Sequence, residues 1–241
     1  MLNKYFFVHI PKTAGSYIKL QLKSKKLLQN ESREKFFKQH MWGKNWVKRK
    51  PSHLSFKSNK FFPNYTLMDG YKESYNRKKV ITSIRNPYDL LCSYYHHGEN
   101  GWGDCNKFHK INSFKQFIDY YCNCDANDWH VPELNKCLYG QIFNSKGKSN
   151  INYVLFYENL ENNIIDLTEK NFLNKMFKKN FKKKFTATNV SLKKKRSYVE
   201  YYNTSLIKLV KKKCEYELDT FQYSFKTKKN KKIIEISKLV Y

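Results

Sequence analysis

A short segment near the N-terminus combines a lysine, hydroxyls and small residues in a pattern suited to binding an anion. Residues 5–16 have the sequence YFFVHIPKTAGS, in which Lys12 supplies a positive charge and Thr13 and Ser16 supply hydroxyl donors. An apolar strand pattern precedes this turn and a helical pattern follows it, an arrangement that directs free backbone N–H groups at an anion. We therefore expect a phosphate-binding turn, although the G-x-x-x-x-G-K-[ST] spacing of a Walker A loop is absent. The alternative is an ordinary strand, turn and helix whose lysine is merely exposed.

A second polar turn follows an apolar strand pattern at residues 79–84. Arg85 comes directly after that pattern, Pro87 suits the first turn of a helix, and Ser93 lies two helical turns beyond Arg85. A guanidinium presents a fork of donors that matches a phosphate monoester. Either residue alone would be uninformative, because a surface salt bridge or an exposed hydroxyl explains it equally well. Together, after a strand, they predict a second anion-binding turn.

Strand and helix patterns alternate along the chain and must position the two turns. We expect strands at 5–10, 79–84 and 151–157, with a weaker strand pattern at 233–240. We expect helices beginning at or covering 17–22, 89–97, 113–121, 158–177 and 198–218. Strands separated by helices favour a parallel sheet, in which ligands bind outside the carboxyl ends of the strands. The two polar turns are therefore expected at the same edge of one sheet.

The composition is that of a folded and strongly basic protein. The chain has 241 residues, of which 40% are hydrophobic, so it can form one α/β domain or, less readily, two small ones. Its formal net charge of +27 has two explanations, a polyanionic partner or the lysine-rich composition expected of an AT-rich genome. No apolar run approaches transmembrane length, and the N-terminal run leads into Pro11 and Lys12 rather than a cleavage site. We expect a cytoplasmic protein.

The cysteines favour reduced thiols over a disulfide scaffold, since they are few for a chain of this length. There are six: Cys92, Cys105, Cys122, Cys124, Cys137 and Cys214. A zinc site is conceivable from four of the residues in one region, Cys105, His109, Cys122 and Cys124. Their spacings are not those of usual zinc sites, so we expect no metal.

The segments HIPKTAGS (9–16) and SIRNPYDLLCSYY (83–95) resemble the two cofactor motifs of sulfotransferases that use 3′-phosphoadenosine 5′-phosphosulfate (PAPS). The resemblance is closest to the carbohydrate sulfotransferases, which include the heparan and chondroitin enzymes. It implies a P-loop-NTPase-like three-layer α/β/α sandwich with a central parallel sheet. The first motif would hold the 5′-phosphosulfate and the second the 3′-phosphate, without a metal. The implied cofactor-binding residues are Lys12, Thr13, Ala14, Gly15, Ser16, Arg85 and Ser93.

The resemblance covers most of residues 4–225 and implies a division of the chain. A sulfotransferase domain would span 1–225, with a variable acceptor-binding region at 98–147, and a basic tail would occupy 226–241. The segment YVLFYENL departs from the family, since Phe156 stands where an arginine is usual. That departure removes a charge from this strand, although the residues after Phe156 can still orient loops.

Two further cofactor contacts are implied by a likeness to the family's closing segment, which begins at Asn189. By this likeness Arg196 and Ser197 would close over the nucleotide. A solvated basic face explains residues 193–196 equally well.

Transfer of a sulfuryl group requires charge stabilisation on the leaving phosphate and a base for the acceptor proton. By resemblance Lys12 would neutralise the phosphate, and His53, in KPSHLSF between the two motifs, would be the base. Histidine titrates near neutral pH and suits this task. His40 is the second candidate, and His96 and His97 are the third. A merely exposed loop histidine remains an alternative for His53.

These features predict an enzyme that transfers the sulfuryl group of PAPS to an acceptor hydroxyl. The expected acceptor is a carbohydrate, anionic glycans included, or another hydroxyl-bearing molecule, and no nucleic-acid partner is expected. Two alternatives stay open. One is a P-loop nucleotide kinase, against which the missing Walker A spacing argues. The other is a non-catalytic polyanion-binding protein on a degenerate sulfotransferase fold. The expected source is a bacterial or viral cytoplasm, or a luminal domain without its anchor.

Overall fold

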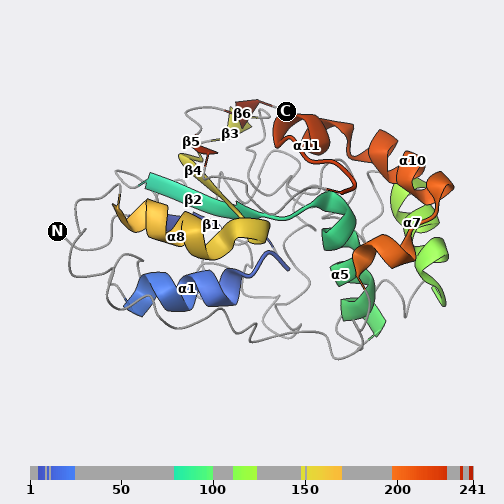
Figure 1. The fold of residues 1–241 in the computed structure, drawn as a ribbon, viewed down its shortest axis with the longest axis horizontal. Helices are drawn as coiled ribbons and strands as arrows, with labels where there is room; N and C mark the ends of the chain where they lie inside the picture. The colour runs from blue at the N-terminus through green and yellow to red at the C-terminus, as the bar shows by residue number, and fades with distance from the viewer. Residues whose placement is uncertain are drawn as a thin grey trace, which may run out of the picture.

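The computed structural model describes residues 5–8, 10, 12–24, 79–99, 111–123, 148–149, 151–169, 197–226, 234–235 and 239–240. These residues form an α/β fold around a four-stranded sheet, whose strands are labelled in Figure 1. The strands, in their order across the sheet, are β1 (Tyr5–Val8), β2 (Lys79–Ile84), β4 (Tyr153–Phe156) and β5 (Ile234–Glu235). The first three are parallel and β5 is antiparallel to β4. The prediction of a parallel sheet with intervening helices is confirmed.

The register of the parallel strands places the two polar turns at one edge of the sheet. Val8 at the end of β1 pairs with Thr82, and Ile84 at the end of β2 pairs with Phe156 at the end of β4. The Thr82 hydroxyl also donates a hydrogen bond to the Val8 carbonyl at 2.9 Å. Because the strands run in the same direction, the segments that leave β1, β2 and β4 emerge side by side. This was the expectation from the strand patterns.

Two apolar clusters bury the opposite faces of the sheet. Alternate residues of a strand point to opposite faces. Tyr5 and Phe7 pack with helices α1 (Gly15–Ser24) and α8 (Leu160–Glu169), while Phe6 and Val8 belong to the other cluster. That second cluster includes residues of α5 (Pro87–Glu99), α7 (Phe114–Asn123), α10 (Thr204–Lys213) and α11 (Glu215–Thr220). In Figure 1, α1 and α8 run alongside the strands, whereas α5, α7 and α10 gather at the end to which β2 leads. None of the helices within the described ranges is long and apolar enough to cross a membrane.

The prediction of one long helix at 198–218 is wrong. The structure has a 3₁₀ helix, η8 (Tyr198–Tyr201), followed by α10 and α11 as separate segments. Asn203 interrupts the helix between η8 and α10, because its backbone is extended. Its side-chain oxygen accepts a hydrogen bond from the Leu206 N–H at 2.9 Å and so caps the start of α10. Cys214 separates α10 from α11. The apolar period continues through these breaks, so periodicity alone did not reveal them.

The C-terminal stretch from residue 226, predicted as a basic tail with a weak strand pattern at 233–240, contributes two short strands within that pattern. One is β5, which pairs with the outer side of β4. The other is β6 (Leu239–Val240), which pairs with β3 (Lys148–Ser149) in a separate antiparallel ladder. Residues 234–240 therefore pair with two strands from earlier in the chain, β4 and β3.

Asn163 of α8 carries a first testable expectation, because it fastens α8 to the end of β4. Its buried side-chain oxygen accepts a hydrogen bond from the Phe156 N–H at 2.7 Å. Asn163→Ala should lower the free energy of unfolding by about 1–3 kcal/mol, since it removes the acceptor of a buried N–H. Urea denaturation measures this. The exposed neighbour Asn162 gives the control, because Asn162→Ala should change stability by less than about 0.5 kcal/mol. Equal effects of the two substitutions would contradict the expectation.

Candidate functional site

The turn between β1 and α1 has an uncommon backbone conformation. Lys12 has φ of 62° and Ala14 has φ of 63°, although neither is glycine. Such left-handed residues cost on the order of 1–3 kcal/mol each and persist only where surrounding contacts hold them. Left-handed residues are also a component of the backbone nests that direct N–H groups at anions. Since α1 starts at the next residue, Gly15, its free N–H groups lie beside the same turn.

Two hydroxyls hold this turn against β2. The buried Thr13 hydroxyl donates to the Ile10 carbonyl at 2.8 Å and lies 2.7 Å from the Ser83 hydroxyl. Ser83, also buried, donates to the Thr13 carbonyl at 3.0 Å. Any contact of Thr13 with an anion would therefore come from its backbone N–H, since its hydroxyl is used inside the protein. Ser83 was not among the predicted site residues. The sequence feature that could have indicated it is a hydroxyl side chain near the end of a buried strand pattern.

Arg85 joins the β1 turn to the turn between β2 and α5. Its Nη1 donates to the Lys12 carbonyl at 3.2 Å, and its Nε and Nη2 donate to Asp89 Oδ2 at 2.7 and 2.6 Å. The ring of Tyr157 covers the guanidinium, with 4.1 Å between Cζ and the ring centroid. Burial opposes ionisation of Arg85, but Asp89 and Tyr157 outweigh it and the pKa is raised. Arg85 is thus a fixed positive charge between the two predicted turns.

Lys12 adds a second positive charge to this edge of the sheet. Its burial and the positive charge of Arg85 lower the pKa of the Lys12 ammonium. Two cations held this close repel each other, and a bound anion would relieve that repulsion. The structure therefore brings the predicted residues Lys12 and Arg85 together, with Asp89 paired to the Arg85 guanidinium.

Asn86 is the centre of a polar network that fixes the β2–α5 turn. Its N–H donates to Glu158 Oε1 at 2.6 Å, and its side-chain amide donates to the Ser224 carbonyl at 2.8 Å. Glu158 Oε2 in turn accepts from the Tyr223 hydroxyl at 2.9 Å. Burial raises the pKa of the Glu158 carboxyl, although these hydrogen bonds and Arg85 act in the opposite direction. Glu158, directly after β4, and residues 223–224 thus both support the turn that carries Arg85.

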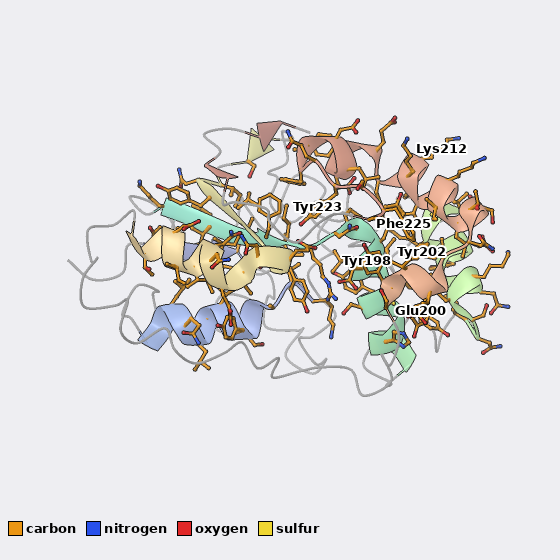
Figure 2. The ribbon with its side chains drawn as sticks, viewed as in Figure 1. Tyr198, Glu200, Tyr202, Lys212, Tyr223 and Phe225 are labelled. Carbon is orange, nitrogen blue, oxygen red and sulfur yellow. The ribbon has the colours of Figure 1, made fainter. Side chains whose placement is uncertain are left out.

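A cluster of aromatic rings packs Phe225 against η8 and α5. The Phe225 ring lies 5.9 Å from Tyr198, 5.6 Å from Tyr202 and 5.1 Å from Tyr88, centroid to centroid. Figure 2 shows Tyr198, Tyr202 and Phe225 together beside α5. The predicted cofactor residue Ser197 is exposed at the start of η8, and its N–H donates to Glu200 at 2.9 Å. Within the described ranges the structure does not bond Ser197 to either polar turn.

The other predicted anion-binding residues occupy the two turns and their helices. Ala14 is half-buried, Gly15 is buried, and Ser16 is exposed in the first turn of α1. Helix α5 begins at Pro87, as expected, and Ser93 is partly exposed on it. Ser93 lies about 9 Å along the helix axis from Pro87, at 1.5 Å per residue.

The histidine candidates differ in what the structure describes. His96 is buried, and its ring packs edge-on against Tyr95 and Tyr201 with centroid distances of 5.2 and 5.1 Å. Such packing makes it an unsuitable base for an acceptor that approaches from solvent. The favoured candidate His53, the second candidate His40, the predicted cofactor residue Arg196 and the side chain of His97 lie outside the described residues.

The described cysteines are free thiols, and no metal site is seen among the described residues. Cys92 and Cys214 are buried, and Cys122 is partly buried. No group of three or more histidine, cysteine or acidic side chains in these ranges could hold an ion. Three of the four residues weighed as a zinc site, Cys105, His109 and Cys124, lie outside the described residues.

Comparison of the chain with protein-family models, with characterised proteins and with solved structures gives no match. The chemistry of the site must therefore be inferred from its own residues. These provide a turn with left-handed residues, the start of a helix, an ammonium and a guanidinium at the carboxyl ends of two parallel strands. The β1 turn and the start of α1 suit an anionic group, and Arg85 holds that turn in place.

The raised pKa of Glu158 predicts a distinctive dependence of stability on pH. A carboxyl whose pKa is higher in the folded than in the unfolded state stabilises the fold most below its ordinary value of 4.5. That contribution is lost as pH rises through the folded value. Glu158→Gln keeps an acceptor for Asn86 and does not ionise. The unfolding free energy of Glu158→Gln minus that of the wild type should therefore rise between about pH 4 and pH 7.

Urea denaturation at several pH values checks this expectation. The control is Glu215→Gln, because Glu215 is an exposed carboxylate on α11 and its removal tests the general effect of one lost negative charge. A difference between Glu158→Gln and the wild type that stays constant with pH would show that Glu158 does not titrate differently in the folded state.

Proposed function

We propose that the chain is a sulfotransferase that binds PAPS at the carboxyl ends of β1 and β2 and transfers its sulfuryl group to a carbohydrate hydroxyl. The observation that carries the proposal is the contact between Arg85 Nη1 and the Lys12 carbonyl, which unites two turns 73 residues apart in sequence. Ligands of parallel α/β sheets bind at this edge. Buried clusters on both faces of the sheet support the three-layer P-loop-like sandwich that the proposal includes.

The donor set fits a nucleotide that carries phosphate groups at two positions. In the proposed complex Lys12, the backbone N–H groups of residues 13–16 and the Ser16 hydroxyl hold the 5′-phosphosulfate. Arg85 and Ser93 hold the 3′-phosphate, and the raised pKa keeps Arg85 charged throughout the physiological range. A nucleotide without a 3′-phosphate would make no contact with Arg85 and Ser93. The arrangement thus favours PAPS over ATP.

The residues of the turn have defined tasks in the proposed reaction. PAPS supplies a sulfuryl group, whose sulfur gains a bond to the acceptor oxygen as its bond to the phosphate oxygen breaks. Lys12 stabilises the negative charge that remains on the phosphate. The backbone N–H groups contribute without rearrangement, because the contacts to Ser83 and Arg85 already hold the turn. His53, assigned by resemblance, accepts the proton of the acceptor hydroxyl.

Calorimetric titration with 3′-phosphoadenosine 5′-phosphate, AMP and ATP tests the proposed cofactor. The wild type should bind the 3′-phosphorylated nucleotide at least about tenfold more tightly than AMP, the scale of one charge-assisted hydrogen bond. Equal affinity for all three nucleotides would contradict the proposal. Preference for ATP would support the nucleotide kinase instead.

His53→Ala tests the proposed base. Transfer of sulfate to a glycan panel should fall by about a hundredfold or more, while the affinity for 3′-phosphoadenosine 5′-phosphate stays unchanged. His40→Ala is the matched variant and should retain transfer. Full activity in His53→Ala would refute the assignment, and loss in His40→Ala alone would move the role to His40.

A further inference from the structure

Asp89 lies four residues beyond Arg85 and sets the orientation of its guanidinium. Both side chains are nearly buried, with 8% of Arg85 and 13% of Asp89 exposed. Asp89 Oδ2 accepts hydrogen bonds from Nε and Nη2, and Tyr157 covers a face of the same group. Held in this way, Arg85 donates from Nη1 to the Lys12 carbonyl. The direction of that donor is therefore set by two residues that lie outside the β1 turn.

The Lys12 carbonyl belongs to the part of the turn that most needs support. A non-glycine residue with φ of 62° relaxes to a negative φ unless contacts with its neighbours prevent it. The peptide after Lys12 cannot rotate without breaking the contact to Arg85, and the next peptide is held by Ser83 through the Thr13 carbonyl. Both supports come from the end of β2 and the residue directly after it.

We infer that Asp89 is a positioning residue for the anion-binding turn. It holds Arg85 so that Nη1 retains the Lys12 carbonyl, and the backbone N–H groups of the turn keep their common direction. A carboxylate that only neutralised a buried guanidinium would leave the turn unaffected. The inference stands on these contacts alone, and only its nucleotide-affinity test rests on the proposed function.

Hydrogen–deuterium exchange tests the inference without any ligand. In Asp89→Asn, the amide hydrogen of Ile18, which donates to the Ala14 carbonyl of the turn at 3.1 Å, should exchange about tenfold faster or more, while those of β1 and β2 stay protected. Asp89→Glu keeps the carboxylate and should restore slow exchange. The matched control is Asp119→Asn, because Lys115 and Asp119 form an ion pair of the same spacing on α7 with 68% and 39% of their side chains exposed. This control should leave the turn unchanged.

A double variant separates the turn from the stability of the whole fold. Arg85→Met with Asp89→Leu replaces the buried ion pair by apolar side chains, a change that proteins often tolerate. The core should stay protected, yet the Ile18 amide, which is bonded to the Ala14 carbonyl, should again exchange faster because the Lys12 carbonyl has lost its donor. Exchange of the Ile18 amide at the wild-type rate, in a folded double variant, would overturn the inference.

Titration with adenosine 5′-phosphosulfate, which lacks the 3′-phosphate, adds the functional measurement. Asp89→Asn should bind it about tenfold more weakly than the wild type and Asp89→Glu should recover affinity. If the wild type binds no adenine nucleotide, the proposed function fails and the exchange data still decide the role of Asp89. Faster exchange with unchanged affinity would retain the positioning role and remove the turn from the nucleotide site.

Discussion

The buried guanidinium of Arg85 imposes the constraint on which the candidate site depends. A charge can be buried only where partners replace its water, and here the partners come from three parts of the chain. Asp89 comes from α5, the Lys12 carbonyl from the β1 turn, and Tyr157 from the end of β4. The guanidinium has all of these partners only when the segments that follow β1, β2 and β4 lie next to one another.

The uncommon backbone at Lys12 and Ala14 follows from that meeting. Left-handed residues are unfavourable by themselves, so their presence means that the surroundings determine the turn. A turn held before any ligand arrives can present its N–H groups without a cost of ordering, which is the condition for electrostatic preorganisation. The lowered pKa of Lys12 is linked to the same contacts, because the folded turn buries its ammonium and, as a smaller cause, places it near the charge of Arg85.

Local sequence patterns predicted some elements of the structure correctly and others wrongly. The pattern at 79–84 coincides with β2, because a run rich in β-branched residues that ends at Arg85 and Pro87 is typical of a strand. The pattern at 198–218 misled, since Asn203 caps a new helix without disturbing the apolar period. The Thr13 hydroxyl was expected to face a ligand and instead donates to Ile10, a choice that depends on Ser83 from another strand.

The types and order of the residues were enough to indicate an α/β fold with Lys12 and Arg85 after two strands, because periodicity and turn chemistry are local properties. The four-residue spacing of Arg85 and Asp89 also permits an ion pair at the start of α5. Local properties could not show that Arg85 holds the Lys12 carbonyl, or that Glu158 and Ser224 support the turn through Asn86. Those contacts join residues more than 70 positions apart, so they exist only once the strands have paired and the register has decided which side chains meet.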